Sequence, residues 1–331
     1  MFLSKTPLRV SLFGGGSDFP EYFRDSPGAV LGSTINRYIY TAVLPISDIA
    51  EQKYRISYRT VENTSDVDSI SHPIIREILR YKNVNVGLNI STISDLPGGS
   101  GLGSSSAFTV GFLNVINRFL KIESSPFELF SEAVHIERDI LKENVGIQDQ
   151  LHASNGGLKM YKFEGDNYES HSFLRKKEMI NYWNKSLTLV FTDTFRNSSK
   201  LLTEQISRNS SGLNDHYLNE MVDITLEAQK IFDDQVISPT SCVAEIGKLL
   251  NESWELKKKL GSQISNPVIE SMIEIGKKSG VLGAKLLGAG AGGFILFLTD
   301  ETSKKKLMES FLPANVFSVQ FCEDKSKVYE F

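Results

Sequence analysis

The segment "DLPGGSGLGSSSAF", Asp95 to Phe108, combines glycines and serines in a pattern suited to binding phosphate. Its four glycines allow the backbone to bend closely around a ligand. Its three serines, Ser104 to Ser106, precede an apolar segment, 108–120, that is typical of a buried helix. The N-terminus of a helix has backbone N–H groups without partners and a partial positive charge, so it attracts anions. One serine would be enough to cap the helix, so the pattern favours a phosphate-binding loop over a serine-capped turn.

Two common phosphate-binding motifs are excluded by the residues that surround the glycines. A P-loop requires Lys and then Ser or Thr after GxxxxG, but Gly98 and Gly103 are followed by serines alone. Gly288, Gly290 and Gly293 satisfy GxGxxG. The segment "FILFLTD" that follows them indicates a strand, whereas the Rossmann motif opens a helix.

A single carboxylate interrupts the apolar face of a helix predicted over residues 125–143. Ser125, Pro126 and Glu128 match the N-cap, the first-turn proline and the glutamate of a capping box. The apolar stripe consists of Phe127, Phe130, Val134 and Leu141. Glu137 continues this stripe, where an unpaired carboxylate would be costly. It is therefore interpreted as a cation ligand, with Mg²⁺ the best match, or as a salt-bridged structural residue.

Three further charged residues are open to both structural and functional interpretations. Asp149 lies near the expected start of a helix, where an acidic residue would stabilise the helix dipole. Asp18 follows three glycines and would suit an Asx turn at the end of a strand. Arg9 lies on a predicted strand, 8–13, and arginines are mostly exposed.

The bulk composition predicts a cytoplasmic globular protein. The chain has 331 residues and a net charge of −4, so broad binding to nucleic acid is not expected and an anionic ligand would need local cations. The lysine clusters at 257–259 and 304–306 are interpreted as solvated faces. Cys242 and Cys322 are far apart in the sequence and belong to no CxxC or His-rich motif, so they indicate a reducing compartment. No apolar run reaches the roughly 18 residues of a membrane helix, and the N-terminus lacks the apolar core of a signal peptide.

The pattern of strands and helices predicts an α+β protein with two halves that meet near residues 160–185. Strands are expected in the first half over 8–13, 35–46 and 84–93, which are rich in β-branched and aromatic residues. The second half is expected to contain a strand over 186–193, polar helices over about 197–235 and 240–280, and a strand pair around 285–300.

Three glycine motifs together resemble the conserved motifs of the GHMP kinases, a superfamily that includes galactokinase and mevalonate kinase. The segment "LPGGSGLGSSSA" resembles their second motif, "KTPLRVSLFGGGSDF" (5–19) the first, and "KLLGAGAGGFILF" (285–297) the third. The resemblance implies a two-domain α+β fold: an N-terminal ribosomal-protein-S5-like α/β domain over 1–180 and a C-terminal ferredoxin-like α/β domain over 181–331. Within the superfamily, residues 7–23 and 28–40 are most similar to the D-glycero-D-manno-heptose 7-phosphate kinases.

The resemblance also implies roles for individual residues. Asp149 would be the catalytic aspartate and Arg9 the basic residue facing it, while Ser105 and Glu137 would bind Mg²⁺. The expected ATP-binding residues are Pro97, Gly98, Gly99, Ser100, Gly101, Leu102, Gly103, Ser104, Ser105 and Ser106. The expected residues for the sugar are Gly15, Gly16, Ser17, Asp18 and Gly290. The implied reaction is direct in-line transfer from Mg-ATP to the anomeric hydroxyl of the heptose 7-phosphate.

Several alternatives remain open at the level of sequence. The acceptor could instead be fucose or galactose, and a protein that binds ATP and sugar without catalysis is a further alternative. Arg37, Lys5 and Lys159 are candidates for binding an acceptor phosphate. The expected partners are ATP and a small sugar phosphate, with no nucleic acid and no membrane. The oligomeric state is open, and a homodimer is one alternative.

Overall fold

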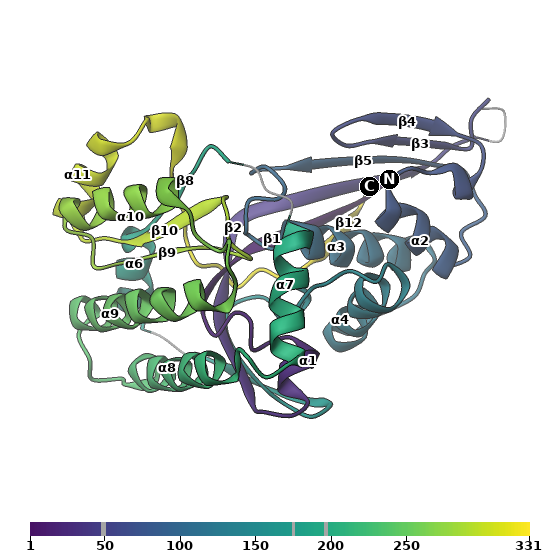
Figure 1. The fold of residues 1–331 in the computed structure, drawn as a ribbon. Coiled ribbons are helices and arrows are strands. Elements are labelled where there is room, and N and C mark those ends of the chain that lie inside the picture. Colours follow the sequence, from purple (N-terminus) through teal and green to yellow (C-terminus); the bar gives the residue numbers. More distant parts are fainter. Residues whose placement is uncertain (48–50, 174–175, 195–197) are drawn as a thin grey trace.

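The computed structural model describes residues 1–47, 51–173, 176–194 and 198–331, and these residues form two β-sheets with helices packed against them (Figure 1). The larger sheet consists of β1 (Phe2–Phe13), β2 (Gly28–Pro45), β3 (Tyr54–Ser57), β4 (Val61–Thr64), β5 (Leu88–Ser94), β6 (Leu158–Glu164), β7 (Asn167–Ser172) and β12 (Lys327–Glu330). The smaller sheet consists of β8 (Leu187–Phe191), β9 (Gly283–Leu286), β10 (Phe294–Leu298) and β11 (Val316–Ser318). The predicted strand pair around residues 285–300 is confirmed, because β9 and β10 pair antiparallel.

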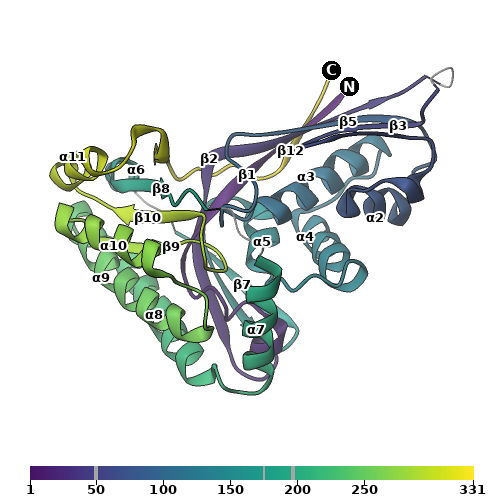
Figure 2. The same ribbon diagram turned by 45° about the horizontal axis from the view of Figure 1, so that its top comes forward.

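The α-helices pack against the two sheets (Figure 2). In chain order they are α1 (Pro20–Phe23), α2 (Pro73–Tyr81), α3 (Ser104–Phe119), α4 (Pro126–Val134), α5 (Gln148–Asn155), α6 (Lys177–Ser186), α7 (Ser198–Ser210), α8 (Asp215–Asp233), α9 (Pro239–Lys257), α10 (Pro267–Ser279) and α11 (Glu301–Ser310). Helices α2, α3 and α4 lie beside the larger sheet, whereas α9 and α10 pack against β9 of the smaller one. None of the helices in the described part of the chain is long and apolar enough to cross a membrane.

Helix α3 is apolar on nearly all sides because it lies between the larger sheet and two other helices. It contacts β1 and β2 on one side and α4 and α5 on the other. The sequence predicted a buried helix over 108–120, and this is confirmed over most of its length. The helix begins earlier than predicted because Ser104 to Ser106 form its first turn.

Strand β2 forms the centre of the larger sheet by pairing with different strands along its length. Residues 28–33 pair with β6, and residues 39–45 pair with β5. Its register with β1 shifts between Pro7 and Arg9. At this shift the backbone N–H of Arg9 donates to the carbonyl of Leu102 at 3.1 Å. The irregularity therefore joins β1 to the glycine segment that precedes α3.

The C-terminal end of the chain returns to the N-terminal sheet, which differs from the predicted division into 1–180 and 181–331. Strand β12 pairs antiparallel with β1, and the terminal ammonium of Met1 donates to the Phe331 carbonyl at 2.9 Å. The predicted boundary also falls inside α6. No local pattern in the sequence indicated this pairing, because it joins residues at opposite ends of the chain.

The predicted helix 125–143 forms as α4 followed by a π-helical turn, His135–Ile140. Its capping box is confirmed: Ser125 Oγ accepts from the Glu128 N–H at 3.2 Å, and the Glu128 carboxylate accepts from the Ser125 N–H at 2.7 Å. The prediction that Phe127 belongs to a buried stripe is wrong, because this side chain is 60% exposed. Phe127 is the second residue of α4, at the start of the helix, and its ring contacts Phe130 and Tyr168.

Candidate active site

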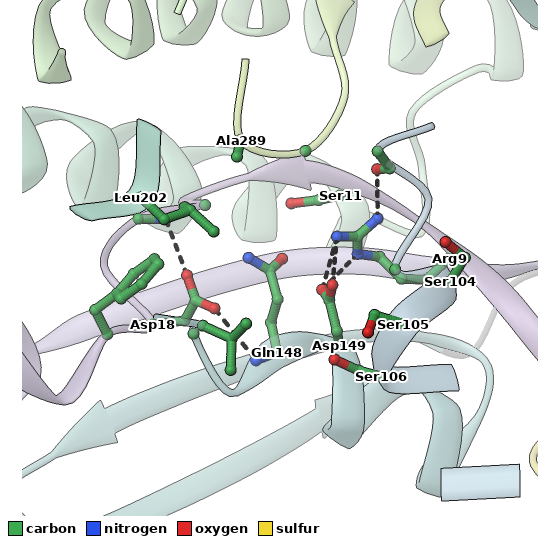
Figure 3. Close-up of a pocket in the computed structure, with 18 of the residues that line it drawn as sticks. Arg9, Ser11, Asp18, Ser104, Ser105, Ser106, Gln148, Asp149, Leu202 and Ala289 are labelled. Carbon is green, nitrogen blue, oxygen red and sulfur yellow. Dashed lines mark hydrogen bonds and ion pairs between the residues drawn. The ribbon is translucent and has the colours of Figure 1, made fainter. Parts of the chain in front are cut away.

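A cavity of about 170 Å³ lies where the two halves of the chain meet, and most of the predicted site residues line it (Figure 3). The predicted residues in its wall are Arg9, Gly15, Gly16, Asp18, Gly99, Gly101, Gly103, Ser104, Ser105, Ser106 and Asp149. They come from β1, from the segment after it, and from the starts of α3 and α5. The other half contributes residues of α7, α9 and β9.

The glycines before α3 adopt the backbone conformations that a tight anion-binding turn requires. Gly99, Gly101 and Gly103 have φ of 73°, 86° and 70°, a region that favours glycine. Gly103 is the N-cap residue of α3, and among the described residues no side-chain hydrogen bond caps the N-terminus of this helix. The Ala107 N–H donates to the Gly103 carbonyl, so the N–H groups of residues 104–106 precede the first intrahelical bond. Such N–H groups can bind phosphate oxygens.

Residues 97–106, which we call the phosphate loop, pack against the glycine turn between β9 and β10. The carbonyl of Ser100 accepts a hydrogen bond from the Phe294 N–H at 3.0 Å. A Cβ atom on Gly293 would lie 2.3 Å from the same carbonyl oxygen. The close approach therefore requires glycine at position 293, where φ is also positive at 102°.

Arg9 and Asp149 form a two-bonded ion pair at the edge of the phosphate loop (Figure 3). Arg9 Nε donates to Asp149 Oδ1 at 2.7 Å, and Nη2 donates to Oδ2 at 2.8 Å. Arg9 Nη1 also donates to the Gly101 carbonyl at 2.7 Å. A Cβ atom on Gly103 would lie 3.2 Å from Asp149 Oδ2, so glycine there lets the loop approach the pair closely. The guanidinium fork fixes the orientation of the carboxylate in the cavity wall.

Asp18 lies elsewhere in the cavity wall and is held by the backbone of two segments (Figure 3). Its Oδ1 accepts from the Gly16 N–H at 2.9 Å, and Oδ2 accepts from the Gln148 N–H at 3.2 Å. A Cβ atom on Gly146 would lie 2.0 Å from Oδ2, so the segment before α5 passes very close to the carboxylate. Asp18 therefore positions the backbone next to Asp149 and also presents a carboxylate to the cavity.

Glu137 is completely buried beneath the first turns of α3, as the sequence pattern predicted. Ser106 Oγ donates to its carboxylate at 2.9 Å, Thr109 Oγ1 donates at 2.6 Å, and the amide of Gln150 donates as well. Burial raises the pKa of this carboxyl to about 7, although the three hydrogen bonds act in the opposite direction. The predicted alternative of a salt bridge is not found among the described residues, because the three partners are neutral.

The residues expected to bind Mg²⁺ provide suitable oxygen atoms, but they are placed differently with respect to the cavity. Ser105 is exposed in the cavity wall, whereas Glu137 does not line it. Within the described ranges, no group of three or more His, Cys, Asp or Glu side chains could hold a metal ion. A magnesium ion at Ser105 would therefore depend on oxygens of the nucleotide, which is common for this ion. Direct ligation by Glu137 stays a prediction.

The other residues predicted to bind ATP or the sugar do not line the cavity. These are Pro97, Gly98, Ser100, Leu102, Ser17 and Gly290. A Cβ atom on Gly290 would lie 2.6 Å from the Cα of Ile264, so this glycine permits close packing of two backbone segments.

The three basic residues considered for an acceptor phosphate lie away from the cavity. Arg37 donates to the Ser318 carbonyl, Lys5 pairs with Asp324, and Lys159 donates to Ser172. The cavity wall contains Lys257 and Lys285 instead.

The interpretation of the 257–259 cluster as a solvated face is wrong for Lys257. This side chain is 7% exposed, because it lies on the inner face of α9 together with Leu250 and Trp254. Lys285 lies within the buried strand β9 and is 5% exposed. Both residues break an apolar pattern, the signal that identified Glu137, so the sequence could have indicated them.

Two polar side chains in the cavity wall were also missed by sequence reasoning. Ser11 Oγ and Gln148 Oε1 are buried and have no hydrogen-bond partner among the described residues. Buried polar atoms are rarely left unpaired, so these atoms are suited to a polar ligand. Serine and glutamine are too common for the sequence alone to mark them.

Comparison with known protein families identifies the class of protein. Residues 70–157 match the family described as GHMP kinases N terminal domain, and residues 239–316 match GHMP kinases C terminal. The chain belongs to the GHMP kinases, enzymes that transfer phosphate to an alcohol group.

Individual relatives are similar over nearly the whole chain. A D-glycero-alpha-D-manno-heptose 7-phosphate kinase of Campylobacter jejuni is 29% identical over 93% of this chain and 92% of its own length. A bifunctional fucokinase/GDP-fucose pyrophosphorylase of Arabidopsis thaliana is 25% identical over 91% of this chain but only 30% of its own. The crystal structure of a D-glycero-D-manno-heptose 1-phosphate kinase from Bacteroides thetaiotaomicron has a TM-score of 0.79 and 23% identity, and the match covers 100% of this chain and 99% of that one. The similarity to this crystal structure confirms the predicted two-domain fold.

Proposed function

We propose that the chain transfers the γ-phosphoryl group of ATP to the anomeric hydroxyl of D-glycero-D-manno-heptose 7-phosphate. The observation that carries the proposal is that the Arg9–Asp149 pair faces the same cavity as the N-terminus of α3. A carboxylate for the acceptor hydroxyl and N–H groups for the donor phosphates are thus within one small space. The choice of acceptor is supported by the 29% identity to the Campylobacter jejuni enzyme.

In the proposed reaction, Asp149 orients the anomeric hydroxyl and accepts its proton. Arg9 holds both carboxylate oxygens from one side, so the pair has a defined direction in the cavity. The acceptor oxygen then forms a bond to the γ-phosphorus of ATP while the bond from that phosphorus to the bridging oxygen of ADP breaks. The products are ADP and the heptose 1,7-bisphosphate, without a phosphoenzyme.

The phosphate loop is proposed to bind the transferred group and the remaining phosphates. The N–H groups of Ser104 to Ser106 would hold phosphate oxygens, and the Ser105 hydroxyl would hold a magnesium ion. The ion would neutralise phosphate charge. Arg9 would keep the loop next to the catalytic carboxylate through its bond to Gly101.

A test of the acceptor compares heptose 7-phosphate with the free heptose, fucose and galactose by ADP release under identical Mg-ATP. We expect heptose 7-phosphate to have the highest kcat/KM, by orders of magnitude over the free heptose, and phosphorus NMR to show a new anomeric phosphate. Asp149→Asn serves as the control for activity that does not come from the chain.

The fucokinase relative makes an unphosphorylated sugar the second candidate for the acceptor. Equal or better use of fucose, galactose or free heptose would contradict the proposal and favour that alternative. The absence of ADP release with every sugar, together with measurable ATP binding, would favour a non-catalytic sugar-binding protein.

A further inference from the structure

We infer that Lys257 and Lys285 form a cationic subsite that binds the phosphate already carried by the acceptor. The inference rests on the proposed function, because it assigns residues to the second anionic group of a sugar phosphate. Both side chains come from the C-terminal half of the chain and enter the cavity wall that contains Arg9 and Asp149. We call this pair of lysines the distal phosphate subsite.

The two ammonium groups contact the segment that leads from β1 to Asp18. Lys257 Nζ donates to the Gly15 carbonyl at 3.0 Å and to Gln205 Oε1 at 3.4 Å. Lys285 Nζ donates to the Leu12 carbonyl at 2.7 Å. Both ammonium groups are therefore held by backbone carbonyls of the first motif, at Leu12 and Gly15.

The positive charges in this part of the cavity affect the pKa of Lys285. Burial is the main cause that lowers the pKa of Lys285 to about 7, and the positive charges of Lys257 and Arg9 contribute to the same shift. Arg9, Lys257 and Lys285 line the same cavity, and all three side chains are buried. An anion bound among them would offset both the desolvation and the repulsion.

The two carboxylates that line the cavity among the described residues, Asp18 and Asp149, accept hydrogen bonds from groups other than these lysines. Asp149 accepts from Nε and Nη2 of Arg9, and Asp18 accepts from the N–H groups of Gly16 and Gln148. The wall therefore has room for a ligand that is anionic at one end.

Buried polar atoms beside the lysines indicate that the rest of the ligand is rich in hydroxyl groups. Ser11 Oγ, Gln148 Oε1 and Gln205 Nε2 are buried without a hydrogen-bond partner among the described residues. A Cβ atom on Gly15 would lie 3.3 Å from Ser11 Oγ and 3.5 Å from Gln148 Nε2, so these groups surround the first motif. A polyol attached to a phosphate would pair with both the hydrogen-bonding atoms and the cations.

The experiment measures kcat/KM for heptose 7-phosphate and for free heptose with the wild type, Lys257→Met and Lys259→Met. Lys259 is the matched control, because it is the same residue type two positions away and is exposed. We expect Lys257→Met to lower kcat/KM for heptose 7-phosphate about 10- to 100-fold, as for a lost bond to a charged group. Its KM for ATP should stay within about twofold, and its kcat/KM for free heptose should fall much less than its kcat/KM for heptose 7-phosphate.

A second variant and a second measurement protect the test against misfolding. Lys257→Gln removes the charge but keeps an amide that can donate to the Gly15 carbonyl, so it should show the same loss. Inorganic phosphate should inhibit the wild type in competition with heptose 7-phosphate, and should inhibit Lys257→Gln at least about tenfold more weakly.

The outcomes separate this inference from the proposed function. If the wild type used free heptose as well as heptose 7-phosphate, the proposed function would fail before any variant was considered. If the wild type required the 7-phosphate but Lys257→Met and Lys257→Gln kept the same preference for it, the distal phosphate subsite would be refuted. A rise confined to the KM for ATP would assign Lys257 to the nucleotide and would also overturn the inference.

Discussion

Replacing Glu137 by glutamine should make the stability of the protein less dependent on pH. The side chain is fully buried, and burial raises its pKa from 4.5 to about 7. Between these two pH values the folded state binds more protons at this position than the unfolded state does. The favourable contribution of the protonated carboxyl is therefore complete below pH 4.5 and is lost as the pH rises through 7.

The expected size of this effect follows from the pKa. A rise from 4.5 to about 7 corresponds to about 3 kcal/mol in the free energy of unfolding, at ~1.4 kcal/mol for each pKa unit. Glutamine cannot ionise, and it has nearly the shape of glutamate. Gln150 Oε1 has no partner among the described residues, so rotation of the Gln150 amide would let it accept from the new side chain. The packing beneath α3 should therefore survive the substitution.

The assay is urea unfolding of the wild type and Glu137→Gln at several pH values from 5 to 8 without metal or nucleotide. We expect the free energy of unfolding of the variant to rise relative to that of the wild type by about 2 to 3 kcal/mol across this range. Glu123→Gln is the control, because Glu123 is exposed and should show no such trend. A difference between variant and wild type that stays constant from pH 5 to 8 would refute the reasoning.

Three further predictions concern the site. Asp149→Asn should keep ATP binding, measured by calorimetry, but lower kcat by roughly 100-fold or more through loss of the proton acceptor; wild-type turnover would refute the catalytic assignment. Glu137→Gln should raise the Mg²⁺ concentration needed for half-maximal activity at fixed ATP, because an anionic oxygen is lost; an unchanged titration would leave Glu137 a structural residue. Gly293→Ala should lower Tm and raise the KM for ATP, since the new Cβ would lie 2.3 Å from the Ser100 carbonyl oxygen. Gly165→Ala is its control, because position 165 also has positive φ but has no atom within 4 Å of a new Cβ, and an equal effect in both variants would contradict the close-contact explanation.

Features that depend on neighbouring residues were predicted well. The capping box of Ser125 and Glu128 spans a single turn, so the residue types were sufficient to identify it. The glycine spacing before α3 likewise predicted a turn in which Gly99, Gly101 and Gly103 adopt positive φ. The burial of Glu137 followed from helical periodicity, which survived even though part of the helix became a π turn.

Long helices were predicted in the correct regions but without their interruptions. The predicted helix 197–235 is divided into α7 and α8, and Gly212 lies between them with φ of 72°. The predicted helix 240–280 is divided into α9 and α10, and Pro267 begins the second helix. A glycine or a proline can be accommodated at several places in a helical pattern, so the break depends on how the flanking helices pack.

By itself, the sequence determined the local features of this protein: a glycine-rich turn at a helix N-terminus, a buried carboxylate beneath it, and three glycine motifs in a characteristic order. The family resemblance implied that Arg9 faces Asp149, but only the tertiary structure decided the geometry of the pair, since 140 positions separate the two residues and no local pattern sets the distance between β1 and α5. For Lys257, the apolar pattern of α9 could have indicated burial, but only the packing of α9 decided that this side chain enters the cavity wall. The physical reason is that backbone conformation and helix capping depend on adjacent residues, whereas the direction of a buried charge depends on surfaces contributed by distant segments.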